Sequence, residues 1–165
     1  MAASTVVKVP RDGRIVLSDN GGSNTYSVAY ENGDFSFDNL TEQADRIIVR
    51  DRGSIVGLRR GDDPVGSLSF TVHMRDFAGT GSDVTLLDAI TGTGTAASFV
   101  SVGGDAFDMY LLDVIFEVEG SDHNDAGDHK ATFNKVLLTA SFSEGSPNSI
   151  SVTGEVYGGI TYVQA

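Results

Sequence analysis

Three long β-type runs dominate the second half of the chain: FDMYLLDVIFEVEG (107–120), ATFNKVLLTASFSEG (131–145) and SISVTGEVYG (149–158). The first two runs are longer than the ~3–10 residues of most strands, and the polar, acidic segment SDHNDAGDHK (121–130) separates them. They predict a long C-terminal antiparallel β-hairpin followed by a third strand. Strands of this length favour a chain that pairs with other copies and builds an assembly.

Shorter runs extend the β pattern toward the N-terminus. TYSVAYE (25–31) and FSFDN (35–39) flank Asn32-Gly33, a two-residue turn signal, and predict a hairpin. VGSLSFTVHM (65–74) alternates apolar and small polar residues, which is typical of a strand with one buried face. The predicted fold class is mainly β: an antiparallel β-sandwich or half-barrel with one short α-helix and the long C-terminal β-hairpin.

The helix is predicted at about 83–91. Apolar residues recur there at spacings of three and four, Ser82 or Asp83 is the predicted N-cap, and Gly92 ends the pattern. A helix this short is stable only when its apolar side packs on the rest of the fold.

The composition limits the class of protein. The 165 residues suit a single domain over 1–165, with residues 1–10 as a flexible N-terminal arm, and 40% hydrophobic residues are typical of a globular chain. The chain has no cysteine, which excludes disulfides, thiolate metal sites and cysteine nucleophiles. No apolar run is long enough for a signal peptide or a membrane span, so we expect a soluble protein.

The formal charge of −12 is unevenly distributed. Residues 1–60 hold eight basic and eight acidic side chains, whereas residues 61–165 hold three basic and fifteen acidic ones. An acidic surface repels DNA, because DNA binding requires Lys and Arg to neutralise phosphates. The asymmetry therefore indicates either a charge that keeps the protein soluble or a surface that DNA passes without binding.

The sequence carries no recognisable catalytic or metal-binding signature. The three histidines are not accompanied by a G-x-S-x-G nucleophile elbow, and the glycine-rich TGTGTAAS (91–98) lacks the lysine of a phosphate-binding loop. In a calcium loop aligned from Asp122, Ala126 and Phe133 occupy positions that need oxygen ligands. We expect a protein that is not an enzyme and holds no metal and no cofactor.

The faces of the long strands suggest a passage. A strand with apolar groups on one side and Ser, Thr and carboxylates on the other suits a sheet that wraps a water-filled channel. Asp113, Glu117 and Glu119 share one parity, which makes an acidic stripe rather than the carboxylate pair of a glycosidase cleft. The candidate lumen-facing residues are Asp113, Glu117, Ser151, Thr153 and Glu155.

A basic segment, RIIVRDRGSIVGLRR (46–60), forms two short β runs around Asp51-Arg52-Gly53. Its arginines either discourage aggregation of an edge hairpin or dock on an acidic patch of another copy, and the sequence leaves both open. The candidate inter-subunit contacts are Arg46, Arg50, Arg52, Arg59 and Arg60, with Asp122, Asp125 and Asp128 of the acidic loop.

In its organisation the chain resembles the tail tube proteins (major tail proteins) of long-tailed bacteriophages. The resemblance is carried by YSVAYENGDFSF (26–37), VGSLSFTVHM (65–74) before the short helix, and ATFNKVLLTASFSEGSPNSISVTGEVYG (131–158). It implies a structural virion protein that forms hexameric rings. Stacked rings make a hollow tail tube, whose acidic lumen lets viral DNA pass from the capsid to the host.

The resemblance also implies a location and partners. The protein is expected in the virion tail, after assembly in the host cytoplasm. Its partners are other copies of itself, a tape measure protein, a tail terminator and tail-tip or baseplate proteins, with DNA only in transit and no membrane span. Two alternatives stay open: an inner-tube component of a contractile or secretion injection system, and a small β-sandwich module for binding at a virion or cell surface.

Overall fold

The structure, a computed structural model, describes residues 13–28, 34–120 and 127–164. This part of the chain folds mainly as β-strands with one short α-helix, α1 (Leu86–Thr91). The strands are β1 Gly13–Ser18, β2 Thr25–Ser27, β3 Ser36–Phe37, β4 Arg46–Asp51, β5 Ser54–Arg60, β6 Gly66–His73, β7 Leu112–Val118, β8 His129–Ser143, β9 Ser149–Val156 and β10 Ile160–Gln164. Two 3₁₀ turns, Gly94–Ala96 and Gly104–Ala106, lie between α1 and β7.

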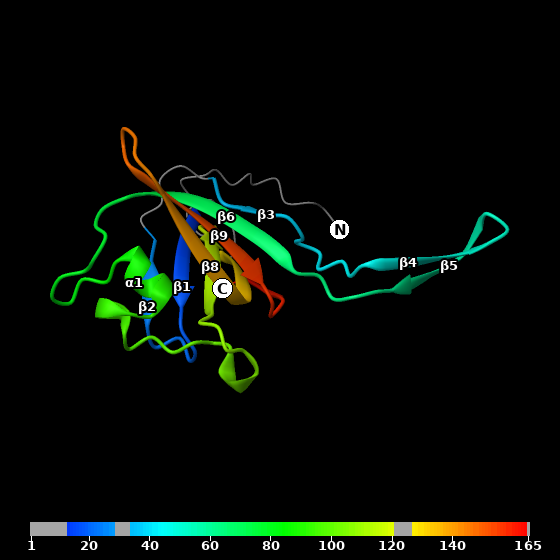
Figure 1. Cartoon of the computed structure of the whole chain (residues 1–165), viewed down its shortest axis with the longest axis horizontal. Helices are drawn as coiled ribbons and strands as arrows, with labels where there is room; N and C mark the ends of the chain where they lie inside the picture. Colours follow the sequence, from blue (N-terminus) through cyan, green and yellow to red (C-terminus); the bar gives the residue numbers. More distant parts are fainter. Residues whose placement is uncertain (1–12, 29–33, 121–126, 165) are drawn as a thin grey trace.

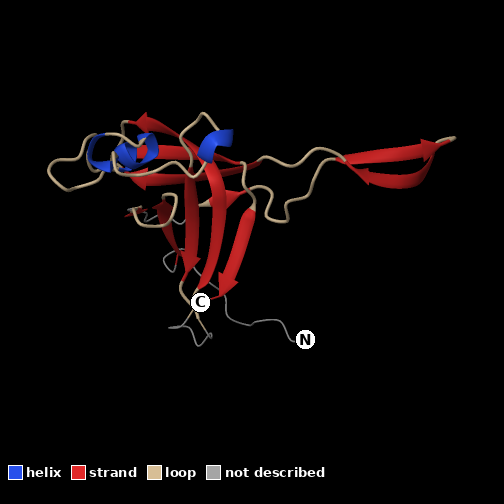
Figure 2. Ribbon diagram, turned by 90° about the horizontal axis from the view of Figure 1, so that it is seen from below, coloured by secondary structure: helices blue, strands red, loops and turns tan. Residues whose placement is uncertain are grey.

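All of the described strand pairings are antiparallel, and the largest sheet has the order β2-β1-β7-β8-β9-β6-β3, with β10 also paired to β8. The 15-residue strand β8 belongs to two layers. Its first part pairs with β7 and β10 in the first layer, and its second part pairs with β9 in the second layer, which also holds β6. Figures 1 and 2 show the two layers running at a steep angle to one another. The predicted sandwich or half-barrel is confirmed.

The core fills the space between the layers. Alternate residues of each strand point inward, as the pleat requires, and α1 adds Leu86 and Ala89. Phe133 is buried on β8 and contacts the rings of Phe35 and Phe37. The largest fully buried side chains are Ile15, Leu17, Leu68, Phe70, Leu111, Leu112, Phe133, Val114, Val136 and Val152.

A β-bulge marks the point where β8 passes from one layer to the other. The pairing register of β7 and β8 shifts between Leu112 and Val114, and Lys135 has a left-handed backbone with φ of 54°. The carboxylate Oδ1 of Asp113 accepts a hydrogen bond of 2.9 Å from the backbone N–H of Lys135. On the other edge, Tyr157 donates its backbone N–H to the Lys135 carbonyl at 3.1 Å. Asp113 therefore stabilises the bend.

Replacement of Asp113 by alanine is expected to lower the free energy of unfolding by about 1–2 kcal/mol, because the Lys135 N–H loses its acceptor. Replacement by asparagine keeps an acceptor oxygen and removes a charge whose burial raises the pKa of Asp113. Asp113→Asn should therefore be at least as stable as the native chain at pH 7. Because the pKa of Asp113 is raised in the folded chain, the native chain gains stability as pH falls through that pKa. The difference in stability between Asp113→Asn and the native chain should therefore shrink in acid. Urea titrations of both variants at pH 7 and pH 4 measure these effects, and equal losses for both would contradict this role.

Two strand predictions are wrong in part. The predicted long hairpin has one long strand only, because β7 has seven residues. Before it, Leu111 donates its N–H to the Ser101 hydroxyl at 3.0 Å and accepts at its carbonyl from Val102, so this segment folds back on the preceding loop. The predicted hairpin of 25–31 with 35–39 is not seen in the described residues, where β2 pairs with β1 and β3 pairs with β6. Phe35 and Phe37 pack into the core instead, and the Asn32-Gly33 turn lies outside the described residues.

The predicted helix exists but is shorter, Leu86–Thr91. Its N-cap is Thr85, whose hydroxyl accepts the N–H of Asp88 at 3.2 Å, and not Ser82 or Asp83. Gly92 ends the helix as predicted, with a left-handed φ of 63°. No helix in the described ranges is long and apolar enough to cross a membrane.

Candidate assembly surfaces

The segment 46–60, named here the basic hairpin, projects from the body as a separate two-stranded sheet (Figure 1). β4 and β5 meet at a tight turn in which Arg52 and Gly53 have φ of 46° and 87°. Positive φ at both central residues gives the two-residue turn whose twist suits a hairpin. Strands of six and seven residues extend it by about 20 Å.

The basic hairpin exposes apolar side chains that contribute nothing to the core. The exposed fractions are 54% for Ile47, 42% for Ile48, 62% for Ile55, 60% for Val56 and 68% for Leu58. An isolated two-stranded hairpin is only marginally stable in water, and clustered exposed apolar groups mark interaction sites. The hairpin therefore has the properties of a contact element for another chain.

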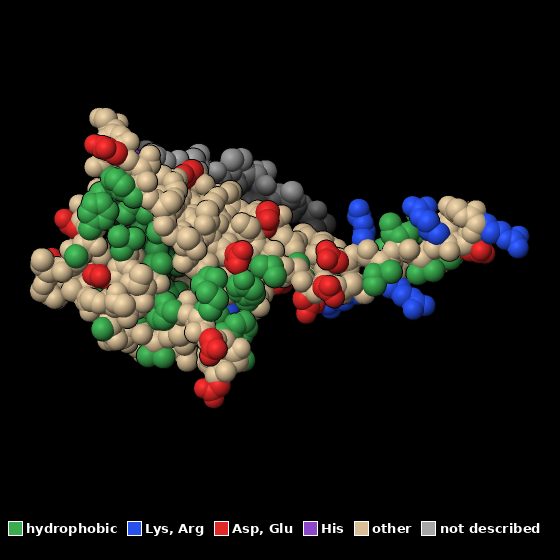
Figure 3. All heavy atoms as spheres, viewed as in Figure 1, with side chains coloured by type: hydrophobic (Ala, Val, Ile, Leu, Met, Phe, Trp, Pro, Cys, Tyr) green, Lys and Arg blue, Asp and Glu red, His purple; other side chains and the backbone are tan. Residues whose placement is uncertain are grey.

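The basic hairpin also separates the charges of the chain. Its five arginines and one aspartate give it a formal charge of +4. Because the whole chain carries −12, the other 150 residues together carry −16. Figure 3 shows Lys and Arg gathered along the projection and acids spread over the body. Arg60 forms an ion pair with Asp63. With the described residues, Arg46, Arg52 and Arg59 form no ion pair or hydrogen bond, so their charges are available to a partner.

Three of the five lumen candidates share one face. The outward side chains of β6, β9 and β8 are small and mostly carry hydroxyls, and we name this surface the hydroxyl face. Glu155 is the one charged group among them, and its carboxylate accepts a hydrogen bond of 2.6 Å from the Tyr157 hydroxyl. Its members pair across the strands as Ser67, Ser69 and Thr71 with Glu155, Thr153 and Ser151, and these with Leu137, Thr139 and Ser141.

The other two lumen candidates, Asp113 and Glu117, lie on β7 in the first layer. Glu117 sits between Arg14 and Lys130 at directly paired positions, with its Oε1 2.7 Å from the Lys130 ammonium. Burial acts to raise the pKa of Glu117, but the hydrogen bonds from Lys130 and Arg14 have the larger combined effect in the opposite direction. The pKa of Glu117 therefore lies below its usual range. Both carboxylates are thus engaged by groups of the same chain.

The acidic loop is only partly described. Asp122 and Asp125 lie outside the described residues. Asp128 accepts the backbone N–H of Gly120 at 3.1 Å and closes the base of the loop. In the described ranges, no group of three or more His, Asp or Glu is arranged to hold a metal ion.

Two structural carboxylates were missed from the sequence. Asp19 is 3% exposed and accepts from the backbone and side chain of Asn24 and from the N–H of Val100. Asp88 accepts from Gly79 at 3.2 Å and from the Thr95 hydroxyl at 2.8 Å. The signal for Asp88 was the T-x-x-D spacing from Thr85, which is a capping pattern. Both residues hold loops in place through these hydrogen bonds.

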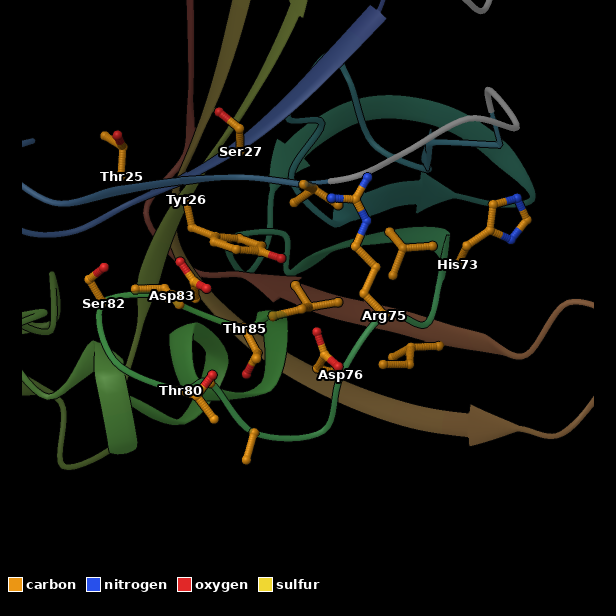
Figure 4. Close-up of a pocket in the computed structure, with 17 residues that line it drawn as sticks. Thr25, Tyr26, Ser27, His73, Arg75, Asp76, Thr80, Ser82, Asp83 and Thr85 are labelled. Atoms are coloured by element: carbon orange, nitrogen blue, oxygen red, sulfur yellow. The ribbon is translucent and has the colours of Figure 1, made fainter.

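A groove of about 620 Å³ lies at the end of the body where β6 leads into α1. Tyr26, Arg75, Asp76, Thr80 and Thr85 are among its lining residues (Figure 4). The loop 75–84 forms one wall, and Val72 and Ile150 of the second layer contribute apolar surface. His73, Ser82 and Asp83 also line it.

The fold is shared with chains of contractile injection systems. One is in the PVC sheath/tube terminator of an extracellular contractile injection system, with a TM-score of 0.59, 12% identity, and coverage of 98% of this chain and 99% of that chain. Another is in the anti-feeding prophage cap, the AFP tube terminating cap (TM-score 0.57, 13% identity, coverage 100% and 96%). A third is in the PVC sheath-tube complex in the extended state, with a TM-score of 0.52, 11% identity, and coverage of 92% of this chain and 89% of that chain. No protein-family model matches the chain, and no curated protein is a significant match.

Proposed function

We propose that the chain is a structural subunit of the tube of a contractile injection system, which assembles as stacked rings around a hollow passage and catalyses no reaction. The fold likeness to tube, cap and terminator structures runs over nearly the whole length of both chains and supports this setting. The observation that carries the proposal is the basic hairpin, whose apolar side chains are exposed and take no part in the core of the subunit.

The tail tube of a bacteriophage is the second candidate, and its architecture is the same. It is supported by the −16 charge outside the basic hairpin, since such a surface lets DNA pass without binding. In that setting the rings are hexameric, and the partners are a tape measure protein, a terminator and baseplate proteins. In the first setting the cargo is protein.

The surfaces fit either tube. The hydroxyl face suits the wall of the passage, because small hydroxyl side chains bind neither phosphates nor apolar cargo strongly, and its one carboxylate, Glu155, adds a ring of negative charge. The basic hairpin suits the contact between successive rings. A head-to-tail contact of this kind closes into a ring or propagates as a filament.

Negative-stain microscopy and sedimentation of the purified chain test the proposal. We expect rings or hollow tubes at high protein concentration, and dissociation as the protein is diluted. A strictly monomeric species at every concentration, including the highest that stays soluble, contradicts assembly. Mixing tubes with DNA and with unfolded polypeptide then tests which cargo they retain.

A further inference from the structure

The end of the body opposite the basic hairpin exposes a pair of aromatic rings. We name this region, residues 75–84 with 142–148, the acceptor end. Phe77 and Phe142 are 56% and 47% exposed, and their rings meet edge to face with centroids 5.3 Å apart. Figure 1 places this region and the basic hairpin at opposite ends of the long axis, and Figure 3 shows hydrophobic side chains gathered there.

The acceptor end is acidic as well as apolar. Its charged residues are Asp76, Asp83 and Glu144, with Arg75 as the one cation. The groove of about 620 Å³ opens between the loop 75–84 and the second layer. Asp76 and Ala78, the residues on either side of Phe77 in the chain, line it. The surface therefore offers aromatic rings, carboxylates and a recess within one region.

We propose that the acceptor end receives the basic hairpin of a second copy of this chain, an inference that rests on the assembly proposed above. The aliphatic Ile55 and Val56 near the hairpin tip match the exposed Phe77 and Phe142, and the tip arginines match the carboxylates. Complementary charges of this kind fix the register of an interface and speed its formation. Arginine also binds favourably over aromatic faces.

The geometry excludes a contact within one copy and favours a repeating one. The basic hairpin points away from its own acceptor end (Figure 1), so the two can meet only between copies. Because each copy carries both elements at opposite ends, every contact leaves a free hairpin and a free acceptor end. The contact is heterologous and propagates along the long axis.

Other described surfaces fit the basic hairpin less well. The hydroxyl face offers one carboxylate and no exposed aromatic among its members. The Glu117 carboxylate is already neutralised by Arg14 and Lys130. The acceptor end combines unneutralised acids with exposed apolar rings.

Cysteine cross-linking tests the contact, because the native chain has no cysteine. The variant Ser54→Cys/Ser143→Cys carries one thiol at the hairpin tip and one at the acceptor end. Oxidation of the assembled variant should give a covalent ladder of many subunits on a denaturing gel. The matched control, Ser54→Cys/Ser69→Cys, places the second thiol on the hydroxyl face and should give no ladder beyond the dimer.

Tubes that assemble but form no ladder with Ser143→Cys, or with Thr80→Cys in its place, overturn this contact and leave the proposed function intact. A chain that never assembles overturns both.

A charge exchange gives an independent readout. Arg52→Glu should raise the protein concentration needed for half-assembly several-fold, and Asp76→Arg should do the same. The double variant Arg52→Glu/Asp76→Arg should restore assembly to within about twofold of the native chain. The matched double variant Arg52→Glu/Asp105→Arg adds an equal charge elsewhere on the exposed surface and should not. Equal recovery in both double variants overturns the pairing.

Discussion

Replacing Ile48 and Leu58 of the basic hairpin by serine is expected to abolish assembly while leaving the body folded. The two residues face one another across β4 and β5 and are 42% and 68% exposed, so the core does not depend on them. Exposed substitutions of this kind usually change the free energy of unfolding by no more than about 0.5 kcal/mol. At an interface, each apolar side chain that loses its burial costs about 1.5–3 kcal/mol. The loss is repeated at every subunit contact, so no tube should remain.

Microscopy and sedimentation measure the assembly, and urea unfolding measures the stability of the body. Met109→Ser is the matched control, because Met109 is equally exposed, at 58%, and lies outside the basic hairpin, the hydroxyl face and the acceptor end. That variant should assemble as the native chain does. Normal tubes from the Ile48→Ser/Leu58→Ser variant would falsify the role given to the hairpin, and so would an unfolded body.

The sequence was informative where a residue pattern reports on the subunit's own core. The alternation in 65–74 predicted β6 with its buried and exposed faces, and Gly92 predicted the end of the helix. It is misleading where apolar residues belong to a loop: the run 107–120 has the pattern of one strand, but Leu111 is buried, at 1% exposure, and precedes β7. Phe35 and Phe37 likewise fit a hairpin pattern but are partly buried and pack against the core.

The basic hairpin shows a second limit of sequence patterns. Its apolar residues and arginines do not sort into a buried and an exposed face, because nearly all of its side chains are exposed. The sequence consequently left two interpretations open, and the projection of β4 and β5 decides that the hairpin is no edge of the main sheet. The surface that the basic hairpin contacts stays a prediction, because that surface belongs to a second copy of the chain.

The two lumen candidates Glu117 and Glu155 are expected to behave in opposite ways when changed to lysine. Glu117→Lys places a third cation between Arg14 and Lys130, removes their shared acceptor, and should destabilise the subunit by about 2 kcal/mol or more. Glu155→Lys changes an exposed group on the hydroxyl face and should alter stability by no more than about 0.5 kcal/mol. Tubes of the second variant should form normally and, if DNA is the cargo, slow its passage.

The variant Glu117→Gln separates charge from size. Because the pKa of Glu117 is lowered in the folded chain, its charge contributes stability above the ordinary glutamate pKa of 4.5. That contribution is lost as pH falls through the pKa of the folded chain. Glu117→Gln should therefore be less stable than the native chain at pH 7, with the difference vanishing in acid. A difference that persists at pH 2–3 would assign the loss to packing. The sequence groups Glu117 and Glu155 as lumen candidates. The cations that neutralise Glu117 are Arg14 on β1, 103 residues before it, and Lys130 on β8, 13 residues after it. Only the pairing of these strands shows that Glu117 joins three strands of the subunit, whereas Glu155 is exposed and, among the described residues, accepts a hydrogen bond from Tyr157 alone.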